Sequence, residues 1–129
     1  MTSGLSVVAD DLRIIGHAIN WRLNGPYKHT SPPGLSEEDR QVLRILFNEV
    51  CCQQRVLQFG AKSILIEVRE PYSCEDGRIQ LPSAYFRLVK DAVASFLGEL
   101  QHSPSELELV TSSPASNSSE LLLRMQAIP

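Results

Sequence analysis

The chain has 129 residues, of which 43% are hydrophobic and 21% are charged, and its formal net charge is −3. These are the values of a folded globular protein, and they exclude a disordered chain. The small negative charge gives no global attraction to nucleic acid or anionic lipid, and no stretch is long and apolar enough for a transmembrane helix. We expect one domain over residues 1–129 that folds without a disulfide or a metal ion.

The cysteines and the first residues bear on where the protein resides. Cys51, Cys52 and Cys74 are odd in number and two of them are adjacent, unlike the disulfide framework of a secreted domain. The first residues lack the basic start and apolar core of a signal peptide. We therefore predict a cytoplasmic protein.

Two amphipathic helices are predicted first in chain order. Over residues 7–23, apolar residues recur at spacings of four, three and four from Val8 to Ile19, which is the period of a helix with one buried face. Ser6 is expected to cap its start. A second helix is predicted over residues 37–58, where acidic residues follow a serine that suits the N-cap position.

In the next segment the spacing of apolar residues changes from that of a helix to the two-residue period of a strand. Apolar side chains alternate over residues 63–69, a turn-rich stretch follows over residues 70–77, and Ile79 and Leu81 then resume the alternation. We predict that the two runs pair as a hairpin with a long tip.

The last third of the chain is predicted to contain a helix and a second hairpin. The helix covers residues 83–101 and is apolar over more than half its circumference, which indicates either the central helix of the fold or one shared with a partner subunit. The hairpin would join residues 106–111 to residues 121–127 through a serine-rich loop over residues 112–119.

These elements predict the fold class. We expect an α+β domain with a four-stranded, mainly antiparallel sheet made of two hairpins, and about three helices packed on it.

The sequence carries no recognisable catalytic, metal or cofactor motif. No histidine or cysteine pair has the spacing of a metal site, and Cys51 and Cys52 would point about 100° apart on a helix. The chain has neither a nucleophile elbow nor a glycine-rich phosphate loop. Cys74 lies beside Glu75 and Asp76, which are expected to raise its pKa and weaken it as a nucleophile. We expect no catalytic residue, metal or cofactor, and lean against an enzyme.

Two side-chain stripes could meet a partner. Arg40, Arg44 and Arg55 line the outer side of the second predicted helix and could contact nucleic-acid phosphates, although nearby glutamates favour a solvated, salt-bridged face.

On the first predicted helix, Arg13, His17 and Trp21 follow one another at four-residue steps. Arginine and tryptophan are common anchors at protein interfaces. The alternative is that Trp21 covers the edge of the core.

Residues 62–111 carry a motif. Residues 64–68 (ILIEV), 77–84 (GRIQLPSA), 86–91 (FRLVKD) and 107–110 (LELV) resemble the N-terminal half of excisionase-type antitoxin proteins, which place a strand pair, a helix and a strand before a helix-turn-helix. The helix-turn-helix is absent here, so the resemblance implies a partner-binding or dimerising role and no inherited DNA binding.

The order of a helix with Asn48, a strand, a helix and a final hairpin also resembles histidine-kinase-type ATPase domains. Their D-x-G-x-G box is missing, and only Asp76-Gly77 is present. This resemblance implies a degenerate form of that fold without nucleotide binding.

The sequence thus favours a non-enzymatic protein-interaction module of the immunity, inhibitor, antitoxin or adaptor type, acting as a dimer or in a complex. Its partner would be a protein or a second copy; neither nucleic acid nor a membrane is expected. The predicted partner-binding residues are Arg13, His17, Trp21, Leu88 and Phe96. The alternatives are a nucleic-acid-binding regulator that uses the Arg40–Arg55 face, a degenerate ATPase fold, and an enzyme assembled from distant residues.

Overall fold

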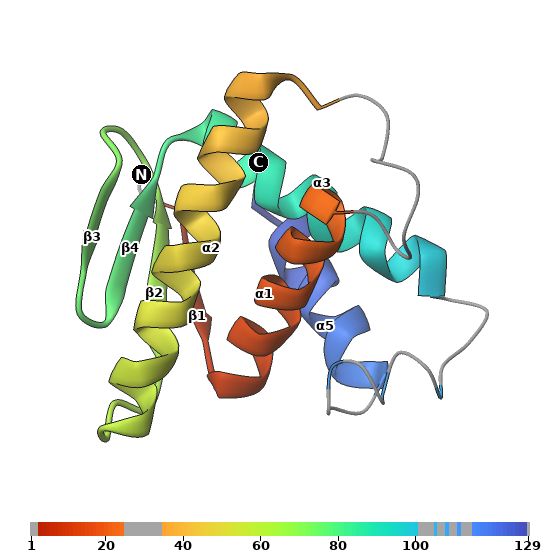
Figure 1. Cartoon of the computed structure of the whole chain (residues 1–129). Helices are drawn as coiled ribbons and strands as arrows, with labels where there is room; N and C mark the ends of the chain where they lie inside the picture. The colour runs from red at the N-terminus through yellow and green to blue at the C-terminus, as the bar shows by residue number, and fades with distance from the viewer. Residues whose placement is uncertain are drawn as a thin grey trace.

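The computed structural model of the chain describes residues 3–24, 35–100 and 115–128, together with Ser105, Glu108 and Thr111. It is an α+β fold with a mixed four-stranded sheet and, in these residues, four helices (Figure 1). In chain order the elements are β1 (Ser3–Val7), α1 (Ala9–Asn24), α2 (Glu37–Gln58), β2 (Ile64–Val68), β3 (Ser73–Glu75), β4 (Arg78–Leu81), α3 (Ser83–Leu100) and α5 (Ala115–Gln126).

The strand order β1-β2-β4-β3 corrects the predicted pairing. β2 is antiparallel to β1 but parallel to β4, and β3 is antiparallel to β4. After β2 the chain passes over to the edge of the sheet and forms the edge strand β3. It then turns back through Asp76 and Gly77 into β4, which lies between β3 and β2. The segment predicted as the tip of one long hairpin is therefore itself a strand, and the sheet is mixed rather than mainly antiparallel.

The short β1 strand was missed by the sequence analysis. Leu5 and Val7 are buried while Gly4 and Ser6 are exposed, which is the alternation of a half-buried strand. Ser6 belongs to this strand and does not cap α1. The N–H of Val8 instead donates to Asp11 Oδ2 at 3.1 Å, as in one half of a capping box.

The second and third helices begin and end close to the predicted residues. Ser36 caps α2 by accepting from the Asp39 N–H at 3.1 Å, and Gly60 follows the helix with a φ of 120°, which suits glycine.

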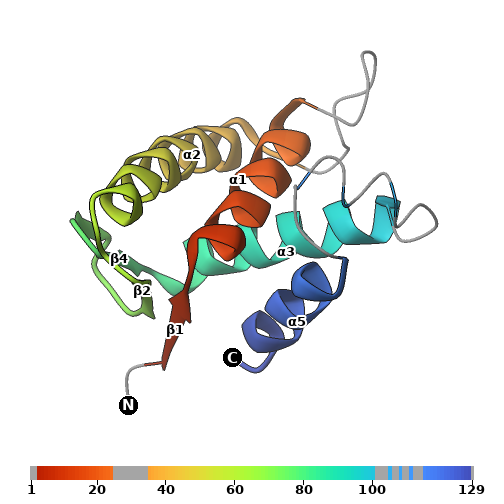
Figure 2. The same cartoon turned by 90° about the horizontal axis from the view of Figure 1, so that it is seen from below.

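The helices cover one face of the sheet. The side chains that β1, β2 and β4 bury on that face are Leu5, Val7, Ile64, Ile66, Ile79 and Leu81. Viewed from below in Figure 2, α1 and α2 lie side by side, α3 crosses beneath them, and α5 lies on the other side of α3. α3 contacts α1, α2, α5 and β4, so it is the central helix of the fold.

The last helix, α5, corrects the second predicted hairpin. Residues 121–126, predicted as a strand, are helical, and the predicted serine-rich loop contributes its last residues to the same helix. Most of the strand predicted over residues 106–111 lies outside the described residues, and Glu108 and Thr111, which are described, are helical. The buried residues of α5 and its end recur at helical spacings of three, four and three: Ser118, Leu121, Met125 and Ile128.

Polar contacts fasten α5 to the rest of the fold. Arg124 forms an ion pair with Asp11 at 2.8 Å and donates to the carbonyl of Ser6 at 3.0 Å. Lys90 of α3 donates to the carbonyl of Ile128 at 3.1 Å. The C-terminal helix is therefore joined to both β1 and α3.

Candidate functional site

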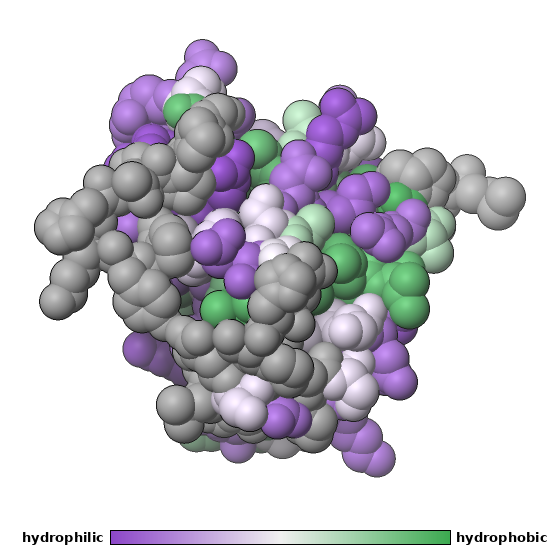
Figure 3. Space-filling view, turned by 90° about the vertical axis from the view of Figure 1, so that its right-hand side faces the viewer, coloured by the Kyte–Doolittle hydropathy of each residue, from purple (hydrophilic) through white to green (hydrophobic). Residues whose placement is uncertain are grey.

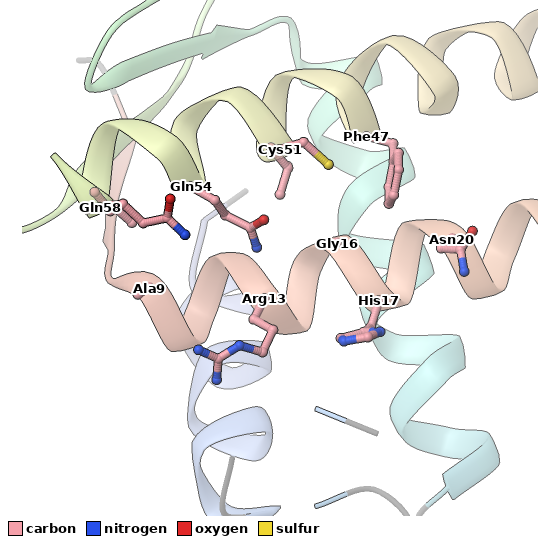
Figure 4. Close-up of a pocket in the computed structure, with 11 residues that line it drawn as sticks. Ala9, Arg13, Gly16, His17, Asn20, Phe47, Cys51, Gln54 and Gln58 are labelled. Atoms are coloured by element: carbon pink, nitrogen blue, oxygen red, sulfur yellow. The ribbon is translucent and has the colours of Figure 1, made fainter. Parts of the chain in front are cut away.

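A groove of about 560 Å³ lies between α1 and α2 (Figure 4). This volume falls within the range of sites that hold a small ligand or a few side chains of a partner. Its apolar lining residues are Ala9, Gly16, Phe47, Val50 and Leu57, and its polar ones are Arg13, His17, Asn20, Cys51, Gln54 and Gln58.

The shape of the groove follows from residue size. A Cβ atom at Gly16 would lie 3.5 Å from Val50 Cγ1, in ordinary van der Waals contact, so the two helices approach closely there. Ala9 and Gly16 add almost no side chain to the α1 wall. The α2 wall carries the larger side chains, which Figure 4 shows at Phe47 and Gln54.

Two of the residues predicted at a partner surface, Arg13 and His17, line this groove. Arg13 Nη1 lies 3.0 Å from Asp10 Oδ1 and 3.5 Å from the carbonyl oxygen of Thr111. Burial, and then the positive charge of Arg13, lower the pKa of His17 below its ordinary value. At neutral pH the described residues of the groove therefore supply one fixed cation and a neutral imidazole.

Sequence reasoning did not find the amide side chains of the groove. Asn20 of α1 and both Gln54 and Gln58 of α2 line it, and each amide can donate and accept hydrogen bonds. The four-residue step between Gln54 and Gln58 places them on one helix face, but such a pair is common on solvated helices and carries no functional signal by itself. Among the described residues, no carboxylate lines the groove.

Trp21, the third member of the predicted stripe, lies apart from the groove. Its half-buried ring packs edge to face against Phe96, with 6.3 Å between ring centroids. Its buried Nε1 has no hydrogen-bond partner among the described residues. This position is that of a side chain covering the edge of the core, the alternative that the sequence left open.

The two α3 residues predicted to bind a partner lie in or against the core, because α3 is the central helix of the fold. Phe96 is 1% exposed and belongs to the core, so this fold does not present it on the surface. Leu88 is half-buried and packs against the core. The wide apolar surface of α3 is used within the chain, and none of the large exposed hydrophobic residues of the described ranges lies on α3.

The arginine stripe of α2 is largely occupied within the chain. Arg40 Nη1 donates to the carbonyl of Leu23 at 3.0 Å, which links the start of α2 to the end of α1. Arg44 lies 3.4 Å from Glu37 in an exposed ion pair. Arg55 is exposed on the same helix.

The three cysteines are free thiols in different surroundings. Cys51 lines the groove, and Cys52 is exposed on another side of α2. Burial and a hydrogen bond with Glu49 raise the pKa of the Cys74 thiol to about 11, so it is protonated at neutral pH. The sequence predicted a raised pKa but attributed it to Glu75 and Asp76; the larger causes are burial and Glu49.

The described residues bring together no three histidine, cysteine or acidic side chains that could hold a metal ion. In the same part of the chain, no helix combines the length and hydrophobicity needed to cross a bilayer. On the side of the molecule shown in Figure 3, hydrophilic residues predominate among the coloured atoms and hydrophobic ones gather mainly at the right of the view.

Comparison of the chain with protein-family models, with curated proteins and with solved structures finds no match.

Proposed function

We propose that this chain is a non-enzymatic protein-binding module that accommodates a segment of a partner protein in the α1/α2 groove. The observation that carries the proposal is the groove itself, whose described residues combine an apolar floor with three amides and one cation. Apolar side chains of a partner would pack on Phe47 and Val50. Its backbone groups would exchange hydrogen bonds with the amides, and an acidic residue would face Arg13.

The chemistry of the thiols and of His17 supports binding over catalysis. A cysteine nucleophile needs a thiolate and an adjacent base, whereas Cys74 is held in its protonated form. Figure 4 shows His17 pointing away from α2, the helix that carries Cys51. The two side chains of the groove that could form a catalytic pair are therefore turned apart.

The nucleic-acid alternative receives less support. Two of its three arginines contact groups of this chain, Arg40 at a helix end and Arg44 at Glu37.

The proposal places the module in the cytoplasm, because its cysteines are odd in number and form no disulfide framework.

Site-specific photo-crosslinking in the source cells tests the proposal. A photoreactive amino acid at Gln54, inside the groove, is expected to give a discrete adduct, whereas the same amino acid at exposed Arg87 of α3 is the control and should give none. Arg13→Glu adds a carboxylate to the groove and should strongly reduce the Gln54 adduct without unfolding the protein. Equal adducts from both positions, no adduct, or an adduct insensitive to Arg13→Glu would refute the proposal.

A further inference from the structure

The amide side chains of the α1/α2 groove offer hydrogen-bonding groups to a bound chain. Gln54 is half-buried and Gln58 is exposed, and neither forms a hydrogen bond with another described residue. Asn20 accepts a hydrogen bond from Asn24 through its Oδ1 at 2.7 Å, so its N–H groups remain as donors. Figure 4 shows Asn20 on α1 and the two glutamines on α2. Both walls of the groove therefore carry amide groups.

Amides on both walls favour an extended occupant. A helix satisfies its backbone groups internally and docks into a groove through an apolar stripe. An extended chain instead points backbone N–H and C=O groups to both sides, and these groups lose water when the chain enters the groove. Asn20 on one wall and Gln54 and Gln58 on the other can replace the lost hydrogen bonds.

The length of the groove sets the size of the segment. Figure 4 shows Ala9 and Gln58 at one end of the groove and Asn20 and Phe47 at the other. The helical rise from Ala9 to Asn20 is about 17 Å, at about 1.5 Å per residue. An extended chain covers this distance with roughly five residues.

Arg13 determines where an acidic residue of the segment binds. Its ion pair with Asp10, at 3.0 Å, joins two partly exposed side chains, and such pairs are weak. A guanidinium carries five N–H donors, so a carboxylate in the groove can bind Arg13 beside Asp10. No carboxylate among the described lining residues would repel it.

An apolar side chain of the segment would bind toward the other end of the groove. Phe47 lies at the Asn20 end, and Val50 precedes it along the groove by about one helical turn of α2. From Arg13 to Asn20 the rise along α1 is about 10 Å, which an extended chain covers with about three residues. The groove thus presents a cation and an apolar surface about three extended residues apart.

We infer that the groove binds an extended segment of a partner protein in which an acidic residue lies about three positions from a large apolar residue. The inference rests on the proposed function, and it adds the conformation of the segment and the order of its side chains.

Selection from a phage-displayed library of random seven-residue peptides tests the order of side chains. The wild type should enrich peptides with Asp or Glu about three positions from a large apolar residue. A synthetic copy of an enriched peptide should bind Arg13→Glu roughly tenfold or more weakly, because repulsion replaces the ion pair. Arg87→Glu makes the same charge change at an exposed position of α3, so it is the matched control and should bind like the wild type.

Methylation of the peptide backbone tests the extended conformation. Methylating one backbone nitrogen at a time should reveal a position where binding to the wild type falls about fivefold or more. At that position the loss should be much smaller for Gln54→Leu, because the methyl group and the substitution remove the same hydrogen bond.

The two ways in which the experiment can fail are distinguishable. Enriched peptides whose apolar residues recur at helical spacings of three and four, or methylation losses equal for the wild type and Gln54→Leu, would overturn the inference and leave the proposed function in place. Peptides that bind Arg13→Glu as tightly as the wild type, or a selection that enriches no sequence, would overturn both.

Discussion

Partial burial decides the ionisation of the reactive side chains in this protein. Cys74 has its pKa raised to about 11 by burial and by Glu49, and burial together with Arg13 lowers the pKa of His17. Both shifts favour the neutral form of the side chain. A sequence lists such residues as candidate nucleophiles and bases, whereas their burial is decided by the packing of the whole fold, and Glu49 reaches Cys74 from another element, α2.

His17 should therefore titrate below the ordinary histidine value of 6.5. Because its pKa is lower in the folded than in the unfolded chain, the unfolded chain binds the proton first. The contribution of His17 to stability is complete above about pH 6.5 and declines as the pH falls below that value. Arg13→Gln removes the neighbouring positive charge and should raise the pKa of His17, as measured by NMR titration of the ring.

Arg87→Gln, at an exposed position of α3, is the control and should leave the titration of His17 unchanged. An His17 pKa at or above 6.5 in the wild type would contradict the prediction, as would an Arg13→Gln variant with an unaltered pKa.

At the scale of elements, the buried amide of Gln53 helps to hold the β3–β4 hairpin against α2. Gln53 is 2% exposed, and its Nε2 donates to the carbonyl of Glu75 at 2.6 Å while its Oε1 accepts from the N–H of Gly77 at 2.9 Å. Gly77 has a φ of 88°, which suits glycine at this two-residue turn. The turn is thus fixed both by its own residues and by a helix distant in sequence.

Gln53→Leu should lower the free energy of unfolding by about 1–3 kcal/mol, because two backbone groups of the turn lose their partner while the side-chain volume is nearly kept. Denaturant unfolding measures the loss, and faster hydrogen exchange at the Gly77 amide should accompany it. Gln54→Leu, one residue along on the groove side, should change stability by no more than about 0.5 kcal/mol. Equal effects of the two substitutions would show that the contacts with the turn contribute little.

Sequence periodicity predicted the elements that are long and whose apolar spacing fits only one kind of secondary structure. α1, α2 and α3 each present several turns of apolar spacing, and the structure confirms all three. β1 was missed because its five residues contain only Leu5 and Val7 as an apolar signal. In α5, the run Leu121–Met125 fits both a strand and a helix, and only its packing against α3 and α1 decides between them.

Strand pairing and the candidate groove depend on contacts that are distant in sequence. Two apolar runs separated by a turn-rich stretch usually pair as a hairpin, but here β3 takes the antiparallel place beside β4 and leaves β2 parallel to it. Arg13 and His17 were predicted as surface contacts from one helix. Their neighbours Gln54 and Gln58 come from a second helix. No local sequence pattern specifies how that helix is positioned relative to the first.

At the scale of the whole molecule, α3 organises the fold. It contacts three helices and a strand, which explains why its apolar surface exceeds the single stripe that a peripheral helix needs. The breadth of that stripe had left two interpretations open, a central helix or one shared with a partner subunit. The buried α3 residues match the first: Phe86, Val89, Ala92, Val93, Phe96, Leu97 and Leu100.

Substitutions on α3 should therefore act on folding rather than on assembly. Phe96 is 1% exposed and contacts Trp21, so Phe96→Ala should cost about 3–5 kcal/mol by leaving a cavity between α3 and α1. Leu88→Ala, at a half-buried position, should cost less, and Arg87→Ala on the exposed side should stay within about 0.5 kcal/mol of the wild type. Denaturant unfolding ranks the three, and sedimentation of each folded variant should match the wild type. If Phe96→Ala changed the sedimentation and left the unfolding curve in place, Phe96 would belong to a subunit interface, and the central role of α3 would have to be abandoned.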